Sequence, residues 1–300
     1  ATPFKMYQNI GATMNRGIEI SVNTVNVDNK NFKWNSTLTF AANHEEITDL
    51  IDGKDIIGSD SHITTSLLIG RPLKSFYHFI NEGIWQENEA EEAAKYFKDS
   101  KKTQPFKPGD IKLRDLNGDY IIDDKDETYL GSQSPKWTGG FNNNFSYKNF
   151  DVSMAFQGTI GNDIWNVAKG SLASAGRQNA LADAYTKAWT KDGDLDAVYP
   201  RITNSDSNNN MRGSSFYVEN GSYLRLQNMQ IGYTLPSHIC QKSKLFSSCR
   251  FYVSGQNIFT LTGYSGLDPE LGINNPLDMG VDTTRYPSSR TFTFGVNLQF

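Results

Sequence analysis

The chain of 300 residues has no long hydrophobic run. No stretch approaches the roughly eighteen apolar residues that a membrane-spanning helix needs, and the mean hydropathy is -0.54, so the sequence excludes transmembrane helices. Transmembrane strands are not excluded, because half of their residues face a wet lumen and their hydropathy signal is weak. Positive charge is also not in excess, with 29 Lys and Arg against 33 Asp and Glu. The net charge is -4 and no Lys/Arg-rich run occurs, which gives no reason to expect nucleic-acid binding or a polybasic anchor.

Signals of catalysis are missing as well. The sequence has no Gly-x-Ser-x-Gly motif, no phosphate-binding loop and no zinc-site spacing, so we expect no enzyme activity. Its two cysteines, Cys240 and Cys249, lie at the two ends of one connection, where they either form a local disulfide or stay as thiols. No signal peptide occurs at Ala1, which predicts that a leader was removed or that the chain is the C-terminal part of a longer protein.

What the sequence does contain is an alternation of apolar and polar residues. In residues 290–300 every second side chain is apolar, namely Phe292, Phe294, Val296, Leu298 and Phe300. A period of two predicts a strand with one apolar face, and its length is about what a tilted strand needs to cross a bilayer. Six further stretches are predicted strands, and a shift of parity near Gln227 in one of them predicts a β-bulge. They are residues 15–27, 32–42, 137–147, 150–160, 222–235 and 250–261.

The connections between these strands alternate in length. Residues 28–30 and 148–149 have turn composition, whereas long loops are expected at about 43–135, 161–221 and 263–289, with helices at 89–98 and 181–190. Short turns at one end and long loops at the other are typical of an outer-membrane barrel. We therefore predict an all-β fold, the C-terminal part of a transmembrane antiparallel β-barrel. It would have about seven long strands and long, partly helical extracellular loops.

The alternative is a secreted or surface-attached β-sandwich that binds glycans without transport. The barrel predicts that the apolar strand faces form one lipid-facing belt about 25 Å tall, whereas the sandwich predicts that they pack together in a dry core of two layers. The residues that decide between the two are Ile18, Ile20, Val22, Phe32, Trp34, Leu38, Phe40, Phe150, Val152, Met154, Phe156, Phe292, Phe294 and Val296.

Segments in order along the chain resemble the C-terminal half of the SusC/RagA family of TonB-linked outer-membrane transporters. The resemblance covers nearly the whole chain, and the ordered set is more specific than any single segment. The segments are NIGATMNRGIE (9–19), PGDIKLRDLNGD (108–119), YKNFDVSMAFQG (147–158), SYLRLQN (222–228), YVSGQNIFT (252–260) and the closing YP…RTFTFG (286–295).

The resemblance implies a plugged barrel of about 22 strands in the bacterial outer membrane. It implies partnership with a SusD-like surface lipoprotein, energy from TonB, contact with membrane lipid and import of oligosaccharides or peptides. Long loops would be extracellular and the C-terminus periplasmic. Residues 1–300 would be a C-terminal barrel segment without the plug domain, the TonB box or the N-terminal strands. Phe300 resembles the terminal aromatic by which such barrels are handed to the insertion machinery.

One acidic segment has the spacing of a calcium-binding loop. Oxygen donors at relative positions 1, 3, 5, 9 and 12, with a backbone carbonyl at 7, follow EF-hand-like spacing. Two features depart from that pattern: Tyr120 stands where glycine normally allows a sharp turn, and Asp126 replaces the usual glutamate. The segment is either a structural calcium site or a solvated acidic loop. The ligands would be Asp115, Asn117, Asp119, Ile121, Asp123 and Asp126.

Aromatic residues in the long loops are candidates for stacking on a sugar or a peptide. We select Trp85, Trp137 and Trp165 as candidate ligand contacts. The alternative roles are packing of the loops and an interfacial aromatic girdle. Trp34 and Tyr147, near the short turns, fit the girdle better than ligand contact.

Overall fold

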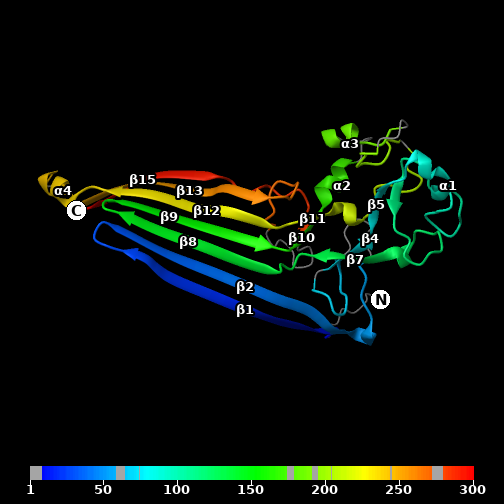
Figure 1. Cartoon of the computed structure of the whole chain (residues 1–300), viewed down its shortest axis with the longest axis horizontal. Coiled ribbons are helices and arrows are strands. Elements are labelled where there is room, and N and C mark those ends of the chain that lie inside the picture. The colour runs from blue at the N-terminus through cyan, green and yellow to red at the C-terminus, as the bar shows by residue number, and fades with distance from the viewer. Residues whose placement is uncertain are drawn as a thin grey trace, which may run out of the picture.

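The structure is a computed structural model that describes residues 9–58, 65–73, 75–173, 179–190, 195–203, 205–243, 245–271 and 280–300. Its main body is one antiparallel sheet of seven strands in the order β1-β2-β8-β9-β12-β13-β15 (Figure 1). This confirms the predicted all-β fold with about seven long strands. The strands are β1 (Gly11–Asp28), β2 (Phe32–Leu50), β8 (Trp137–Tyr147), β9 (Phe150–Ile160), β12 (Tyr223–Thr234), β13 (Ser248–Thr262) and β15 (Thr291–Gln299).

The predicted strand bounds agree with the structure most closely for the two strands joined by the short turn at 148–149. β8 and β9 match their predicted bounds, and the register of β12 shifts between Leu226 and Asn228, which confirms the bulge at Gln227. The prediction for β2 was too short, because β1 and β2 continue to pair as far as Gly11 and Leu50. Residues 43–50 are therefore strand, and the first long loop begins after Leu50.

The register between strands places apolar side chains in rows that run across the sheet. One row crosses six strands, because each residue is the direct pairing partner of the next. It consists of Trp34, Phe145, Val152, Ile231, Val253 and Phe294. A neighbouring row, nearer the short turns, is richer in aromatic rings and consists of Phe32, Tyr147, Phe150, Tyr233, Phe251 and Val296. Adjacent apolar partners on one sheet face make a continuous apolar surface.

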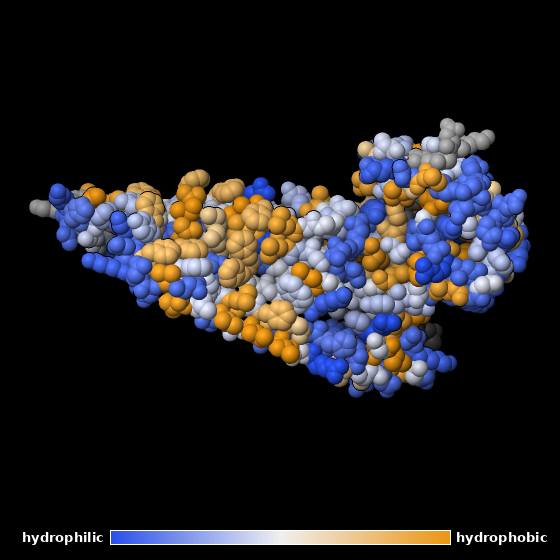
Figure 2. Space-filling view, in the orientation of Figure 1, coloured by the Kyte–Doolittle hydropathy of each residue, from blue (hydrophilic) through white to orange (hydrophobic). Residues whose placement is uncertain are grey.

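This apolar surface is exposed. Ile18 is 65% exposed, Phe292 58% and Phe294 79%, and Figure 2 shows apolar side chains spread across the middle of the sheet. In the described part of the chain these strands make a single sheet, and no second layer covers the rows. The dry two-layer core that the sandwich requires is therefore not formed.

The connections are sorted by length as predicted. Asn29 makes the turn between β1 and β2 by accepting hydrogen bonds from the backbone N–H groups of Asn31 and Phe32, at 3.1 Å and 2.8 Å. The turn after β8, the helix α4 (Ser237–Ser243) and the C-terminus lie at this same end of the sheet, whereas the long loops lie at the other end (Figure 1).

Cys240 and Cys249 are buried and are not bonded to each other, so of the two alternatives the structure has the thiols.

The long loops pack into one lobe. Its largest apolar cluster comes from the first long loop and contains Trp85, Phe106, Ile111 and Ile122. A second cluster joins all three long loops, because Phe76 comes from the first, Trp165 and Tyr217 from the second and Val281 from the third. The first loop contains η1 (Ile51–Gly53), β3 (Thr65–Ser66), β4 (Ser75–Phe79), β5 (Asn81–Ile84), η2 (Glu87–Glu89), α1 (Ala90–Ala93), β6 (Ile111–Leu113), η3 (Asp124–Asp126) and β7 (Glu127–Ser132). The other two contain β10 (Asp163–Asn166), α2 (Val167–Ala173), α3 (Ala182–Thr186), η4 (Ser215–Tyr217), β11 (Val218–Asn220) and β14 (Val281–Asp282).

Both predicted loop helices are shorter than expected. The helix predicted at 89–98 is only α1, because Phe97 instead pairs with a later part of its loop and donates its N–H to the Tyr120 carbonyl at 2.9 Å. The helix predicted at 181–190 is only α3, because the Trp189 N–H bonds to the Tyr199 carbonyl at 2.9 Å. In each case a tertiary backbone contact ends a segment whose composition favours helix.

Candidate functional site

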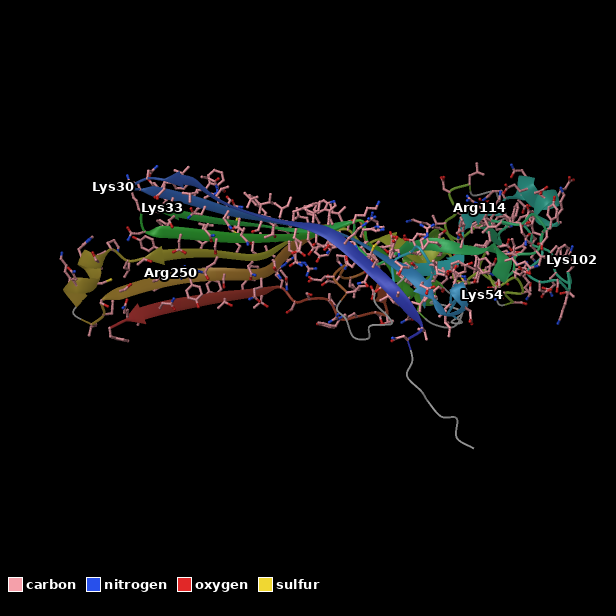
Figure 3. All side chains as sticks on the ribbon, turned by 90° about the horizontal axis from the view of Figure 1, so that it is seen from below. Lys30, Lys33, Lys54, Lys102, Arg114 and Arg250 are labelled. Carbon is pink, nitrogen blue, oxygen red and sulfur yellow. The ribbon has the colours of Figure 1, made fainter. Side chains whose placement is uncertain are left out.

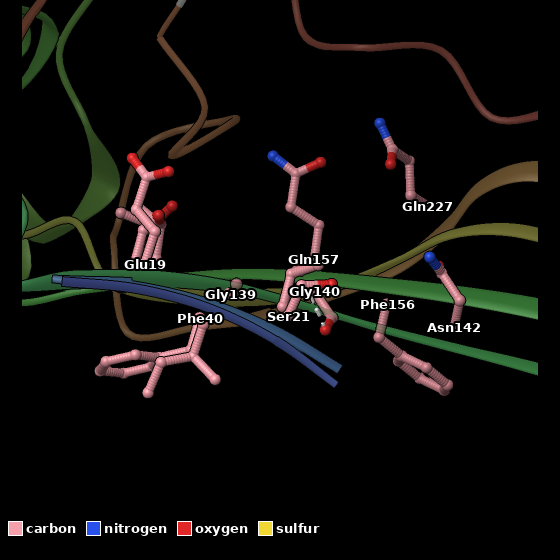
Figure 4. Close-up of a pocket in the computed structure, with 15 residues that line it drawn as sticks. Glu19, Ser21, Phe40, Gly139, Gly140, Asn142, Phe156, Gln157 and Gln227 are labelled. Atoms are coloured by element: carbon pink, nitrogen blue, oxygen red, sulfur yellow. Dashed lines mark hydrogen bonds between the residues drawn. The ribbon is translucent and has the colours of Figure 1, made fainter. Parts of the chain in front are cut away.

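The face of the sheet opposite the apolar rows is polar and carries an open groove. The side chains of Glu19, Gln157 and Gln227 project from this face, whereas Phe40 and Phe156 project to the opposite side (Figure 4). This separation follows from the alternation of side chains along each strand. Hydroxyl and amide groups make up much of the lining of the groove, namely those of Ser21, Thr39, Thr138, Asn142, Gln157, Thr159 and Gln227. Such a surface can donate and accept hydrogen bonds along its whole length.

Arg225 fixes the third long loop to this inner face. The guanidinium lies 2.5 Å from both Asp268 and Glu270, and its Nε donates to Thr260 at 2.9 Å. Burial alone would raise the pKa of Asp268, but hydrogen bonds from the N–H groups of Glu270 and Ser288, together with Arg225, lower it. The loop is thus held by ionised groups against β12 and β13.

Two glycines let large side chains lie flat on the inner face. Arg250 reaches across Gly232 to Asp151, with its Nη2 2.5 Å from the carboxylate, and a Cβ on Gly232 would lie 2.3 Å from that nitrogen. The ring of Tyr252 lies over Gly295, where a Cβ would come within 2.3 Å of it. The inner face near the short turns is therefore shaped by close contacts that leave no room for a larger side chain at either glycine.

The lobe has a buried polar centre at Asp110, which is 0% exposed. Its carboxylate accepts hydrogen bonds from Arg201 at 3.0 Å and 2.8 Å, from Asn208 at 2.7 Å and from Asn210 at 3.0 Å. The Lys107 N–H adds a fifth bond at 3.1 Å. Because Asp110 belongs to the first long loop and its three side-chain donors to the second, this carboxylate joins the two loops.

The three tryptophans selected as candidate ligand contacts are placed differently. Trp85 and Trp165 are only 4% and 2% exposed and belong to the two largest apolar clusters of the lobe. Trp137 is 37% exposed at the start of β8, with its ring centre 5.8 Å from that of Phe40. Packing explains the first two, and ligand contact stays a prediction for all three.

The acidic loop at 115–126 folds by hydrogen bonding its own backbone. Asp115 accepts bonds from the N–H groups of Gly118 and Tyr120 at 2.7 Å and 2.9 Å, and Tyr120 has the positive φ of 62° that its position demands. Asp126 is buried at 0% exposure. Burial raises the pKa of its carboxyl, although bonds from the Leu116 and Asp123 N–H groups oppose that shift. Among the described residues, no three histidine, cysteine or acidic side chains converge as they would around a metal ion.

The comparisons with known proteins give a consistent result. No family model matches the chain. It is 36% identical, over 98% of its length, to "TonB-dependent receptor P3" of Formosa agariphila, and 27% identical, over 99%, to "TonB-dependent receptor SusC" of Bacteroides thetaiotaomicron. Among solved structures it matches the RagAB peptide transporter with a TM-score of 0.75 and 25% identity over 99% of the chain. The chain belongs to the SusC/RagA family of TonB-dependent receptors.

The chain spans about 30% of the length of these SusC/RagA-type relatives, with coverage of 29% of the first receptor, 27% of SusC and 30% of the RagAB chain. The open seven-stranded sheet is consistent with this share, because a barrel of about 22 strands needs roughly three such sheets. No helix among the described residues is long and apolar enough to cross a membrane.

Sequence reasoning missed the residues that organise the site, Arg225, Asp268 and Asp110. Arg225 had a usable signal, because it is a charged residue at a polar-face position of a predicted strand and therefore points into the lumen of a barrel. Asp110 had none, since its side-chain partners are 91 to 100 residues away in the sequence.

Proposed function

We propose that this chain forms part of an outer-membrane TonB-dependent importer of glycan or peptide oligomers. The observation that carries the proposal is the two-faced sheet, with exposed apolar rows on one side and a polar groove on the other. The seven strands have 9 to 19 residues, and about 9–11 are enough for a tilted strand to cross the hydrocarbon layer. The apolar rows would contact lipid, and the polar groove would line the lumen.

The long-loop end would be extracellular, and the short turns and C-terminus periplasmic. The lobe formed by the three long loops would stand at the mouth of the barrel, where a SusD-like lipoprotein would close over the substrate. Energy would come through TonB from a part of the protein outside this segment. The similarity to the "RagAB peptide transporter" supports a peptide substrate, and the hydroxyl and amide groups of the polar groove would suit an oligosaccharide as well.

The test is uptake by cells that carry or lack the full-length protein. Deletion should abolish import of one labelled pool, either oligosaccharides or oligopeptides, and collapse of the proton-motive force should do the same in cells that keep the protein. A SusD-like lipoprotein should co-purify with the full-length protein. Unchanged uptake of both pools after deletion would show that the protein is not their importer.

We propose in addition that the 115–126 loop binds calcium in a structural role. The support is the ligand spacing, together with the local bonds by which side-chain oxygens of Asp115, Asn117, Asp119 and Asp123 accept from N–H groups of the same loop. Lys125 lies 3.8 Å from Asp119 and 3.6 Å from Asp123, so calcium would displace its ammonium group and draw the carboxylates together.

Calorimetric titration of the full-length protein with calcium should show one binding event that disappears in the double variant Asp115→Ala with Asp119→Ala. Glu91→Ala with Glu92→Ala is the control, because these exposed carboxylates lie outside the loop and should leave binding unchanged. Absence of calcium binding in the parent protein would refute the site.

A further inference from the structure

The apolar side of the sheet contains a groove near the short-turn end. It has a volume of about 460 Å³ and crosses β9, β12, β13 and β15. Its side chains are almost entirely apolar: Phe150, Ile231, Tyr233, Phe251, Val253, Phe294 and Val296, with Gly232, Tyr252 and Gly295 completing the lining. The large side chains stand on the apolar face, and Gly232, Tyr252 and Gly295 contribute the backbone floor between them.

The short turns lie at the end of this groove. Phe150 and Tyr233 line it, with ring centres 4.6 Å apart. The turn just before Phe150 is tied to the end of β12 by two bonds between Asn149 and Thr234, at 2.9 Å and 2.8 Å. The N–H of Lys148 bonds to the Asn31 carbonyl at 2.9 Å, so the two short turns are joined. A fixed polar rim therefore adjoins the apolar groove.

This rim is basic. Its described charged groups are Lys30, Lys33, Lys148, Lys242 and Arg250 against Asp28, Asp151 and the carboxylate of Phe300. Lys33 pairs with Asp28 and Arg250 with Asp151, whereas Lys30, Lys148 and Lys242 have no acidic partner within ion-pair distance among the described residues. Lys30, Lys33 and Arg250 lie together at one end of the molecule, far from Lys54 and Lys102 in the loop lobe (Figure 3).

The charge changes sign along β2. On β2, Lys33 stands at the short-turn end, while Glu45, Glu46 and Asp49 stand toward the long loops. An apolar groove that ends at uncompensated ammonium groups complements a molecule with a hydrocarbon chain and an anionic head. Lysines beside a membrane surface attract anionic lipid headgroups, and buried methylene groups add apolar free energy.

We propose that this rim and groove form a site for an anionic glycerophospholipid. The headgroup phosphate lies against Lys148, Lys30 and Lys242, and one acyl chain lies in the groove between Phe150 and Phe294. The inference rests on the proposed function, because it requires the apolar rows to face a membrane. It goes further by assigning a lipid class and the residues that select it.

The experiment uses the full-length transporter reconstituted with an equimolar mixture of phosphatidylglycerol and phosphatidylethanolamine. Native mass spectrometry after detergent extraction measures the ratio of the two lipids that remain bound. The parent should retain phosphatidylglycerol preferentially. The triple variant Lys30→Gln, Lys148→Gln, Lys242→Gln should lose that preference by about five-fold for each lysine removed.

The control is Lys54→Gln, Lys101→Gln, Lys102→Gln, which removes the same charge from the loop lobe and should keep the parental ratio. Phe294→Ala should weaken retention of both lipids and leave their ratio unchanged, because it alters only the groove. An unchanged ratio in the rim variant, or displacement of phosphatidylglycerol by an equal concentration of inorganic phosphate, would overturn the site. Failure of the parent to enter membranes would instead refute the proposed function.

Discussion

An arginine in place of Phe156 should prevent the full-length protein from assembling in the outer membrane, whereas an arginine in place of the adjacent Gln157 should not. Phe156 stands near the middle of β9, in a row formed with Val22, Leu38, Phe141, Leu226 and Phe259 by direct pairing. A charged residue at the lipid-facing midplane of a barrel costs about 2–4 kcal/mol, with smaller costs near the interfaces.

Gln157 supplies the matched control. It lies on the same strand, one residue further, and lines the polar groove of the opposite face. The amount of folded protein in the outer-membrane fraction, read from the heat-dependent shift of the barrel in gel electrophoresis, distinguishes the two variants. Equal assembly of Phe156→Arg and Gln157→Arg would mean that the apolar rows do not face lipid.

The sheet could be predicted because the alternation of side chains along a strand can be read from neighbouring residues. Residues such as Phe292, Phe294 and Val296 alternate with polar ones, and the alternation alone determines which side chains share a face. The lengths of the connections then determined which ends lie together. Even the bulge at Gln227 could be predicted, because a shift in which alternate positions are apolar requires one extra residue in the strand.

The structure of the lobe could be predicted less completely, because contacts between residues distant in sequence determine it. Composition favoured a helix at 89–98, but Phe97 pairs with the chain around Tyr120 and ends α1 early. The sequence does not show that Trp85 and Trp165 pack in the lobe, because their packing partners are distant in the chain and a large aromatic residue in a long loop can serve packing or ligand contact. Where a loop builds its own core, residue type is a weak guide to role.

The same limit applies to the inner face. Alternation correctly assigns Arg225 to the polar side of β12, but it does not reveal that Asp268 and Glu270 return from the third loop to meet it. The sequence therefore predicts which residues lie on the polar face, and the structure adds which of them bind residues of the long loops. Glu19, Gln157 and Gln227 stay exposed to the groove and are the better candidates for contact with its contents.

Replacing Asp110 by alanine should open the lobe while leaving the sheet intact. The change removes a carboxylate that is 0% exposed and leaves Arg201, Asn208 and Asn210 without their shared acceptor. Breaking a buried ion pair from one side costs about 3–5 kcal/mol. That cost corresponds to about two to four powers of ten in the equilibrium between closed and open lobe.

Hydrogen exchange of the full-length protein measures this opening directly. The Arg201 N–H donates to the Gly109 carbonyl at 2.9 Å, across the two loops, so its protection reports whether they stay joined. Val253 in β13 is the internal reference and should exchange as in the parent. The control variant is Asp183→Ala, which removes an exposed pair with Lys187 and should barely change the protection of the Arg201 amide. If Asp110→Ala leaves that amide equally protected, the apolar clusters alone hold the lobe together. The buried carboxylate would then set only the relative position of the two loops.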